Sequence, residues 1–447
     1  MNEQRFLVVG GGRSGVAAAK MLLDLKKAVT VFDGNENFDK NAFCEKIEAE
    51  IPFIIGSASP EDLKNFNVCV VSPGVSLETE IMKAVAAAKI PVWSEIELAY
   101  RFDKGRVVAI TGTNGKTTTT SLVYEIVKEW NKNTLLVGNI EIPYTGLALS
   151  SVPNGCTVAE ISSFQLETMR TVKPRVSAVL NITPDHLDRH KTMENYSALK
   201  LSIAKNQDKN DYCVLNFEDN YLREHAKELS CNVIFFSSKH KIENGIYLDG
   251  KDFVLTIGGK NEVVCRTDEV TLVGTHNFEN IMAAVAMTYC LGVPLDIIRK
   301  VTKRFVAVEH RIEYVCKKNG VTYYNDSKGT NTDAAIKAID AMPGPTLLIG
   351  GGYDKKSDFT EWVSRFPGKV KLLVLLGQTR EKIAETCEKI GFKDYVFAEN
   401  MEEAVKLCAE NAKEGDYVLL SPACASWGMF KCYQQRGEIF KELVKAL

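Results

Sequence analysis

The residues with the clearest chemical potential form a short glycine-containing loop, Gly112-Thr113-Asn114-Gly115-Lys116-Thr117, followed by Thr118. Backbone N–H groups in such a loop cradle anionic oxygens, Lys116 can neutralise phosphate charge, and the Thr117 hydroxyl can ligate Mg²⁺. The loop departs from the full phosphate-loop pattern because Ile110 stands where a first glycine is expected. The apolar run before the loop and the helical spacing after it favour a phosphate-binding loop over a simple turn that leads into a helix.

Metal-ligand residue types recur farther along the chain. Glu160 follows a strand-like run, the position at which an acidic residue would hold Mg²⁺ beside a phosphate loop. His186 and His190 are four residues apart, so they could share a helix face and bind zinc, although a capped polar loop is the plainer interpretation. Lys200, judged from spacing alone, is predicted to be a solvated helical lysine.

A second glycine-rich loop lies at the N-terminus. Gly10–Gly15 fits G-x-G-x-x-G after an apolar run, and Asp33 lies 18 residues beyond Gly15. Taken alone, this pattern indicates a dinucleotide site and therefore an NAD-linked dehydrogenase. A structural turn in a nucleotide-type domain that holds another ligand explains the glycines equally well.

Three polar loops near the C-terminus each combine turn-forming residues with side chains able to bind a ligand. They are Asn325–Asn331, Gly350–Lys355 and Ser421–Ser426, and the last two directly follow buried strand-like runs. Because open α/β sheets bind ligands at the carboxyl ends of their strands, these loops are expected to contribute to one site. Unrelated tight turns are the alternative.

The elements that must position these residues alternate between short apolar runs and helical patterns, which predicts an α/β fold with mostly parallel sheets. A helix is expected over 117–130, after the phosphate loop. Strands are expected at Phe6–Gly10, Val29–Phe32, Val68–Val71, Val92–Trp93, Val107–Ile110, Thr346–Ile349, Leu372–Leu376 and Tyr417–Leu420. A charged segment, Arg101–Gly105, reads as a linker, and the predicted domains are 1–103, 104–308 and 309–447.

Composition limits the classes of partner. The chain has 447 residues and a net charge of -2, which gives no electrostatic reason to expect nucleic acid or an anionic membrane as the main partner. We expect no membrane insertion, because no apolar run approaches membrane-spanning length. Twelve scattered cysteines without a C-x-x-C pair indicate reduced, mostly buried thiols, and therefore a cytoplasmic protein. We also expect a monomer.

Taken together, the motifs resemble the Mur ligase family of ATP-dependent amide-forming ligases. The matching segments, in chain order, are TGTNGKTTTT, EISSFQLET, NITPDHLDR, THNFEN and His310-Arg311. The resemblance spans nearly the whole chain. It implies a Rossmann-like N-terminal domain for a UDP moiety, a central phosphate-loop ATPase domain and a Rossmann-like C-terminal domain for the incoming amino acid.

The resemblance also implies a role for individual residues. Phosphate and nucleotide contacts of ATP would come from Gly112, Thr113, Asn114, Gly115, Lys116, Thr117, Thr118, Asn280, Arg311 and Asp326. The UDP-linked substrate would meet Ser14, Gly15, Asp33, Gly74, Asn139, Ser162, Gln165 and His186. Two Mg²⁺ ions would be held by Thr117, Glu160, His186 and a carbamylated Lys200, and the catalytic residues would be Lys116, His186 and Lys200.

Within the family, the C-terminal loops resemble those of the member that adds D-glutamate to UDP-N-acetylmuramoyl-L-alanine. The D-glutamate pocket would comprise Lys328, Thr330, Lys355, Ser426 and Tyr433. Tyr433 stands where phenylalanine is expected, which adds a hydroxyl group, and Gly329 stands where alanine is usual. The nearest alternative is a sister ligase that uses another amino acid.

The implied reaction forms an acyl phosphate from the substrate carboxylate and the γ-phosphate of ATP, and the amine of D-glutamate then attacks it. Two Mg²⁺ ions and Lys116 would reduce the repulsion between the two anions. Because the sites lie on three domains, the last domain is expected to close over the others. The hinge is predicted near Val308–His310.

Overall fold

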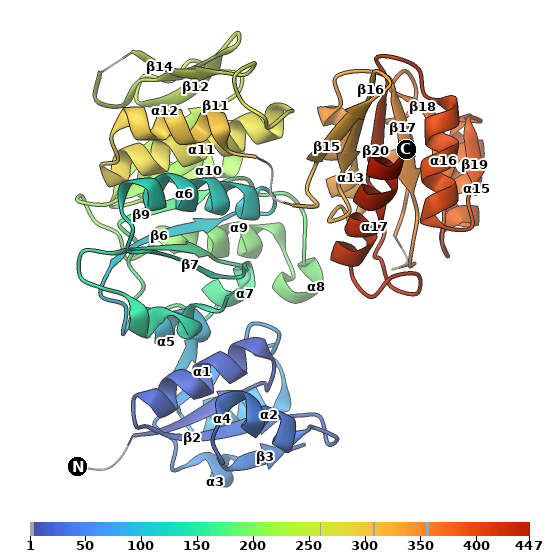
Figure 1. Cartoon of the computed structure of the whole chain (residues 1–447). Coiled ribbons are helices and arrows are strands. Elements are labelled where there is room, and N and C mark those ends of the chain that lie inside the picture. The colour runs from blue at the N-terminus through green and yellow to red at the C-terminus, as the bar shows by residue number, and fades with distance from the viewer. Residues whose placement is uncertain (1–3, 141, 260, 307–308, 355–356) are drawn as a thin grey trace. The chain divides into compact units, whose positions relative to one another are not determined.

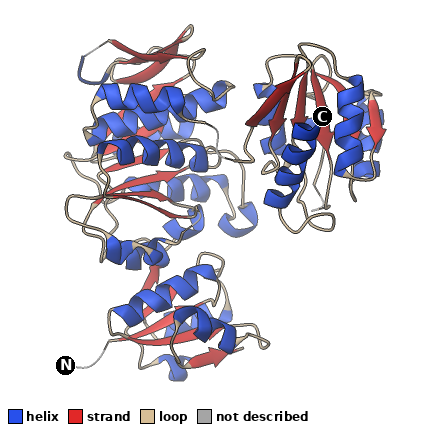
Figure 2. Cartoon of the chain, in the orientation of Figure 1, coloured by secondary structure: helices blue, strands red, loops and turns tan. Residues whose placement is uncertain are grey.

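The computed structural model describes residues 4–140, 142–259, 261–306, 309–354 and 357–447 (Figure 1). The chain divides into two compact units, one of Met1–Glu269 with Glu279–Lys303 and one of Val270–Phe278 with Arg304–Leu447. Helices and strands alternate along both units (Figure 2), and the strands form three sheets. The predicted α/β class with mostly parallel sheets is confirmed.

The first sheet, in the first unit, has five parallel strands in the order β3-β2-β1-β4-β5. The strands are β1 (Arg5–Val9), β2 (Ala28–Asp33), β3 (Phe53–Ile55), β4 (Val68–Val71) and β5 (Val92–Ser94). The helices are α1 (Arg13–Asp24), α2 (Lys40–Ile47), α3 (Pro60–Leu63), α4 (Glu80–Ala87) and α5 (Glu95–Tyr100). This strand order is typical of nucleotide-binding folds, in which ligands lie at the carboxyl ends of the strands.

The second sheet has nine strands in the order β14-β13-β12-β11-β10-β9-β6-β8-β7, in which β13 runs antiparallel to both β12 and β14 and the other pairs are parallel. The strands are β6 (Arg106–Thr111), β7 (Thr134–Gly138), β8 (Cys156–Glu160), β9 (Val176–Val179), β10 (Tyr212–Asn216), β11 (Asn232–Ser237), β12 (Gly245–Asp249), β13 (Asp252–Leu255) and β14 (Glu262–Arg266). Its helices include α6 (Lys116–Trp130), α7 (Ser163–Leu166), α8 (Leu187–His190), α9 (Met193–Leu201), α10 (Asn220–His225), α11 (Thr275–Leu291) and α12 (Leu295–Arg304). Because β6 lies between the parallel strands β9 and β8, the phosphate loop is flanked by the carboxyl ends of both strands.

The third sheet, in the second unit, has the order β15-β16-β20-β17-β18-β19, and only β15 is antiparallel to its neighbour. The strands are β15 (Glu313–Lys318), β16 (Val321–Asn325), β17 (Thr346–Gly350), β18 (Val370–Leu375), β19 (Tyr395–Phe397) and β20 (Tyr417–Leu420). The helices are α13 (Thr332–Ala341), α14 (Thr360–Val363), α15 (Arg380–Ile390), α16 (Met401–Asn411) and α17 (Tyr433–Ala446). The polar loops that begin at residues 325, 350 and 421 therefore follow three adjacent strands: β16, β17 and β20.

All eight strands predicted from apolar runs are confirmed, as is the helix after the phosphate loop. Strands outside these eight runs, among them β12–β14 and β15, were not predicted. The predicted linker over Arg101–Gly105 is held firmly. The carboxylate of Asp103 accepts hydrogen bonds from the Tyr144 hydroxyl at 2.7 Å and from the Thr157 hydroxyl at 2.6 Å.

The proposed domain boundaries at 103 and 308 stay predictions, and Val308 lies outside the described residues. Beyond that gap, His310 and Ile312 have φ angles of 65° and 46°, in the left-handed region that non-glycine residues rarely adopt. The predicted hinge therefore adjoins an unusual stretch of backbone.

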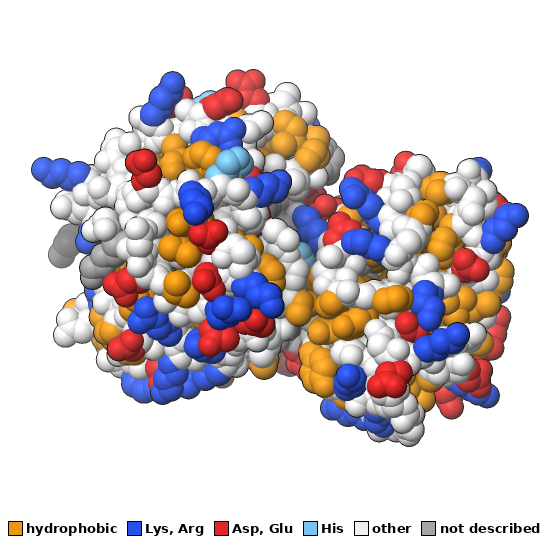
Figure 3. Space-filling model, turned by 90° about the horizontal axis from the view of Figure 1, so that it is seen from above, with side chains coloured by type: hydrophobic (Ala, Val, Ile, Leu, Met, Phe, Trp, Pro, Cys, Tyr) orange, Lys and Arg blue, Asp and Glu red, His pale blue; other side chains and the backbone are white. Residues whose placement is uncertain are grey.

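The surface charge, the cysteines and the helix hydropathy can each be compared with what the composition predicts. Basic and acidic side chains are interspersed on the face seen in Figure 3. All twelve cysteines are free thiols and eight of them are buried, as the sequence predicts. Within the described ranges, no helix combines the length and hydropathy needed to cross a membrane.

Candidate active site

The phosphate loop follows β6 and leads into α6, as predicted. Gly115 is the residue before α6 and has a φ of 82°, and Gly112 has a φ of 153°, so both need the conformational freedom of glycine. A Cβ atom at position 115 would lie 2.2 Å from Oδ1 of Asn280. Asn280, on α11, is buried and also accepts from the Thr119 hydroxyl at 3.3 Å. The predicted nucleotide residue Asn280 therefore packs directly on the loop.

The loop is supported by Asn181 and Thr183, in the segment after β9, two residues to which the sequence patterns gave no role. The side chain of Asn181 accepts from the backbone N–H of Asn114 at 2.9 Å and donates to the carbonyl of Asn114 at 3.1 Å. The Thr113 hydroxyl donates to the carbonyl of Thr183 at 3.1 Å. This reciprocal pairing fixes the loop, so that its N–H groups are preorganised for an anion.

Two lysines converge on this loop. Nζ of Lys116 donates to the carbonyl oxygens of Gly112 and Thr113, at 2.9 and 2.8 Å. Nζ of Lys200, on α9, donates to the same Gly112 oxygen at 2.8 Å. Lys200 is only 1% exposed, so the interpretation of this residue as a solvated lysine is wrong. Residue spacing could not reveal this, because the buried face of α9 is largely polar.

The environment of Lys200 favours a neutral amine. Burial, and secondly the positive charge of Lys116, lower the pKa of Lys200 to about 6, while the carboxylate of Asp185 opposes this shift. At pH 7.5 an ordinary lysine has on the order of one neutral amine in a thousand, whereas with a pKa near 6 the neutral form dominates. Lys200 is therefore available as a nucleophilic amine.

The strand ends beside the loop hold two buried oxygens that have no hydrogen-bond partner among the described residues. They are Oγ1 of Thr111, at the end of β6, and Oε2 of Glu160, at the end of β8. The other carboxylate oxygen of Glu160 accepts from Nδ2 of Asn139 at 2.9 Å. A buried carboxylate oxygen without a donor is costly unless a cation approaches it, so Glu160 fits the predicted metal ligand.

The two histidines do not form a zinc pair. His190 is buried, with Nε2 3.0 Å from the Ser163 hydroxyl and Nδ1 3.6 Å from a carboxylate oxygen of Glu167. His186 precedes α8 with a φ of 51°, and its side chain is 48% exposed. The ring of Phe164 contacts both imidazoles, at centroid distances of 4.8 and 5.5 Å. The imidazole of His186 is exposed, with Nε2 3.5 Å from a carboxylate oxygen of Asp185, so solvent or a ligand can reach it.

Ser162 and Gln165 lie directly after Glu160, at the start of α7. They form a capping box, in which Gln165 N–H donates to the Ser162 hydroxyl while Ser162 N–H donates to the Gln165 side chain at 2.9 Å. The S-x-x-Q spacing is a known signature of this motif. These two predicted substrate residues therefore also fix the start of a helix next to the Glu160 carboxylate.

The N-terminal glycine loop borders a cavity of about 460 Å³ at the carboxyl ends of β1, β2 and β4. Asp33 and Gly74 are among its lining residues. The carboxylate of Asp33 accepts from Gly11 N–H at 2.8 Å, and a Cβ atom at Gly15 would lie 1.9 Å from the Gly10 carbonyl oxygen. The glycines therefore allow close packing of α1 on β1, and the half-buried Ser14 lies in the first turn of α1.

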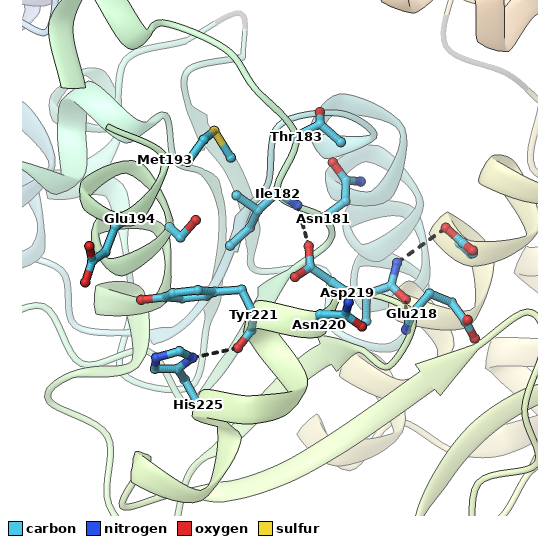
Figure 4. A pocket seen from close by; sticks show the side chains of 13 residues that line it. Asn181, Ile182, Thr183, Met193, Glu194, Glu218, Asp219, Asn220, Tyr221 and His225 are labelled. Carbon is cyan, nitrogen blue, oxygen red and sulfur yellow. Dashed lines mark hydrogen bonds between the residues drawn. The ribbon is translucent and has the colours of Figure 1, made fainter. Parts of the chain in front are cut away.

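A larger cavity of about 780 Å³ opens beside the segment after β9 that hydrogen-bonds to the phosphate loop (Figure 4). Asn181 and Thr183 line it, together with Asp219, whose carboxylate accepts from Ile182 N–H at 2.8 Å. On another wall the ring of Tyr221 stacks on His225 at a centroid distance of 3.9 Å. Sequence patterns could not reveal this cavity, because its lining residues come from four separate segments of the chain.

In the second unit, Asp326 follows β16 and is buried. Its carboxylate accepts from the Ser421 hydroxyl at 2.7 Å and from Ile312 N–H at 3.3 Å. Burial raises the pKa of Asp326 to about 7, against the opposing effects of Ser421 and the guanidinium of Arg311. Nε of Arg311 is buried without a hydrogen-bond acceptor among the described residues. Asp326 and Arg311, both predicted to contact the nucleotide, therefore lie close enough to interact electrostatically.

The pKa of Asp326 predicts how stability depends on pH. Between about pH 4 and 7 the folded state binds a proton that the unfolded state has lost, so the stability from this group falls as pH rises through that window. Asp326→Asn should therefore raise the thermal midpoint relative to wild type more at pH 8 than at pH 5. The control Asp358→Asn alters an exposed carboxyl with a lowered pKa and should show no such change. An equal effect of Asp326→Asn at both pH values would contradict the assignment.

The residues predicted to bind D-glutamate lie in the loops after β16 and β20 and at the start of α17, as far as the structure describes them. Nζ of Lys328 lies 5.7 Å from the centroid of the Tyr433 ring, Ser426 is buried, and Thr330 is half-buried. Lys355 lies outside the described residues. A Cβ atom at Gly329 would lie 2.3 Å from Oδ2 of Asp326, so an alanine here would require the Asp326 side chain to move.

Arg436 is a residue that the sequence analysis missed. It is 1% exposed and donates to the Ser327 hydroxyl at 3.0 Å, the Ser327 carbonyl at 2.8 Å and the Cys424 carbonyl at 3.1 Å. It therefore ties the loop after β16 to the loop after β20. The only available signal was a lone arginine in the first turn of an amphipathic helix.

Comparisons with known proteins agree with this geometry. The model of the Mur ligase MurD-like N-terminal domain matches residues 4–94, the Mur ligase middle domain 110–288, and the Mur ligase glutamate ligase domain 310–424. UDP-N-acetylmuramoylalanine–D-glutamate ligases of Lachnospira eligens and Lachnoclostridium phytofermentans are 53% and 49% identical. The alignments cover 100% of both chains for the first, and 99% of this chain and 98% of the relative for the second.

Solved structures show the same fold. UDP-N-acetylmuramate-alanine ligase of Thermotoga maritima has a TM-score of 0.61 at 17% identity, with 99% of each chain covered. MurF ligase of the same organism, in complex with ADP, has a TM-score of 0.61 at 20% identity, covering 94% of this chain and 96% of that one. The family models and the full-length relatives replace the dehydrogenase interpretation, and the chain belongs to the Mur ligase family.

Proposed function

We propose that this chain is an ATP-dependent ligase that joins D-glutamate to the L-alanyl carboxylate of UDP-N-acetylmuramoyl-L-alanine. The observation that carries the proposal is the convergence of Lys116 and Lys200 on the Gly112 carbonyl, in a chain whose full-length relatives bear the name of that ligase. The named relatives favour D-glutamate over the amino acids of sister ligases. Peptidoglycan precursor synthesis is the pathway that this activity would serve.

The chemistry requires an activated carboxylate, because a free carboxylate is a poor electrophile. The γ-phosphate of ATP supplies the activation by forming an acyl phosphate, with ADP as the leaving group. The N–H groups of the loop and the ammonium of Lys116 would bind the phosphates and reduce the repulsion between the two anions. The D-glutamate amine would then attack the acyl carbon and expel phosphate, with loss of a proton from the nitrogen.

Mg²⁺ would supply positive charge at the transferring phosphoryl group. Thr117 and Glu160 would hold one ion, which agrees with the unpartnered buried oxygen of Glu160. His186 and a modified Lys200 would serve a second. The support for His186 is its exposed imidazole beside Phe164.

We infer that Lys200 carries a carbamate. The neutral amine attacks CO₂, a C–N bond forms, and the proton released from nitrogen passes to solvent. The carbamate replaces a neutral amine by an anion, which Lys116 attracts and which can bind Mg²⁺. This modification would explain why a buried lysine occupies a position at which a metal ligand is needed.

The remaining assignments divide by substrate. We assign the UDP moiety to the 460 Å³ cavity beside Asp33 and Gly74, with Ser14 and Gly15 in the adjoining loop. Asn139, Ser162, Gln165 and His186 would line the muramoyl-L-alanine chain. Asn280, Arg311 and Asp326 would contact the nucleotide, and Lys328, Thr330, Lys355, Ser426 and Tyr433 would bind D-glutamate. Because ATP and nucleotide-linked sugars are cytoplasmic metabolites, we place the protein in the cytoplasm.

Trapping the acyl phosphate tests the proposed activity. The protein is incubated with ATP, Mg²⁺ and UDP-N-acetylmuramoyl-L-alanine but without an amino acid, and borohydride is then added. Reduction of an acyl phosphate gives an alcohol in place of the L-alanyl carboxylate, which mass spectrometry detects. The alcohol should be absent when a non-hydrolysable ATP analogue replaces ATP. Its absence with ATP itself would contradict the proposal.

A further inference from the structure

Arg189, on α8, joins three segments of the first unit through one guanidinium group. Its Nε and Nη2 donate to the two carboxylate oxygens of Glu167, at 2.9 and 2.5 Å. Its Nη1 and Nη2 donate to the carbonyl oxygens of Pro73 and Val75, at 3.0 and 3.1 Å. The side chains of Arg189 and Glu167 are each 15% exposed, so these contacts are largely shielded from water and salt.

Each of the three segments adjoins a group that the proposed function uses. Val75 lines the 460 Å³ cavity assigned to UDP. Glu167 directly follows α7, whose first turn is set by the Ser162–Gln165 capping box after Glu160. Arg189 lies three residues after His186 on the same turn, and its guanidinium carbon is 4.2 Å from the centroid of the Phe164 ring, which also contacts His186.

We propose that Arg189 is a positioning residue that couples the UDP cavity to the reacting end of the substrate. A ligand bound against the Pro73–Val75 loop restricts the motion of the Pro73 and Val75 carbonyl oxygens. Because both oxygens accept hydrogen bonds from Arg189, they hold its guanidinium in place. The guanidinium in turn holds α7, through Glu167, in a fixed position relative to the segment that carries His186. This inference rests on the proposed function, because it takes the cavity to be the UDP site.

The chemistry of arginine suits this role. A planar guanidinium presents five N–H donors in a rigid fork, so it can bind a carboxylate in a bidentate manner and two carbonyl groups at once. The ammonium of a lysine is a compact point charge and cannot reproduce that geometry. Enzymes use the binding energy of remote substrate parts to align reacting groups, and a rigid connection of this kind is a physical means of doing so.

Hydrogen exchange tests the coupling without catalysis, with UDP alone as the ligand. In wild type, UDP should slow backbone exchange at residues 73–76 and also at 162–168 and 186–190. In Arg189→Lys, UDP should protect 73–76 only. Protection confined to 73–76 in wild type, or remote protection retained in Arg189→Lys, would overturn the inference. If UDP fails to protect 73–76 in wild type, the placement of UDP itself is wrong and the inference falls with it.

Kinetics provide a second readout that a purely structural role would not produce. Turnover is compared for UDP-N-acetylmuramoyl-L-alanine and for its 1-phospho fragment, which lacks UMP. Wild type should show a kcat about tenfold higher with the full substrate, because remote binding energy aligns the carboxylate. Arg189→Lys should lose most of that advantage while its kcat for the fragment changes less than about twofold. Equal losses with both substrates would mean that Arg189 only stabilises the fold.

The chain offers a matched control in Arg101. This arginine also pairs with a glutamate, Glu97, at 2.9 Å, and lies over an aromatic ring, Trp93, at 4.1 Å. Neither its carboxylate partner nor its ring lines the UDP cavity. Arg101→Lys should therefore leave the ratio of the two kcat values and the remote protection by UDP unchanged. A change equal to that of Arg189→Lys would contradict the inference.

Discussion

Lys200→Ala is expected to lower kcat by at least about a hundredfold, with partial recovery when formate or acetate is added. The substitution removes the carbamate proposed as a metal ligand and leaves a space beside the Gly112 carbonyl that a small carboxylate can enter. Steady-state phosphate release with and without the added acids measures the effect. Depletion of CO₂ should lower the activity of wild type but not that of Lys200→Ala.

Lys205 provides the control for this experiment. It is another partly buried lysine with a lowered pKa, and it donates to the carbonyl of Met169, away from the phosphate loop. Lys205→Ala should keep its kcat and show no response to formate. Unchanged activity of Lys200→Ala would contradict both the carbamate and the assignment of Lys200 to the reaction.

Lys116→Ala is expected to abolish acyl-phosphate formation, with a loss of about a thousandfold. The ammonium of Lys116 is bonded to two carbonyl groups of the loop and so lies where the phosphates would bind. Its removal leaves the loop N–H groups and metal ions alone to offset the charge of two approaching anions. Rapid-quench measurement of ADP formation in the first turnover is the direct assay.

Two further results would support this role. Lys128→Ala, in the last turn of the same helix, alters an exposed lysine beside Tyr124 and should leave the first turnover unchanged. Loss of the Lys116 charge should also raise the pKa of Lys200, because that charge is the second cause of its lowered value. A near wild-type rate of ADP formation in Lys116→Ala would contradict the phosphate-loop assignment.

The sequence predicted the parts of the fold that depend on local pattern. Central parallel strands are buried on both faces, so β1, β6 and β17 appear as continuous apolar runs between helices. The phosphate loop was equally visible, because its chemistry depends on contiguous residues. Half of the positions of β13 are only half-buried, and no position of β15 is fully buried, so these strands gave a weaker signal.

The sequence could not predict features that depend on which residues meet in space. Lys200 lies on a helix whose buried positions include Tyr196 and Ser197, so the face that packs near the phosphate loop looks polar in the sequence. The contacts of Arg189 join residues more than 100 positions apart. The raised pKa of Asp326 results from its burial, and the Ser421 hydroxyl that opposes this shift follows a different strand. Such properties arise from tertiary packing.

The most direct test of the central claim is phosphate release from ATP with UDP-N-acetylmuramoyl-L-alanine and each of four amino acids. They are D-glutamate, L-glutamate, D-alanine and meso-diaminopimelate. Fast phosphate release is expected only with D-glutamate, together with a product heavier by one glutamyl residue. Turnover with a different amino acid would place the chain elsewhere in the family, and phosphate release with none of the four would contradict the proposed ligase activity.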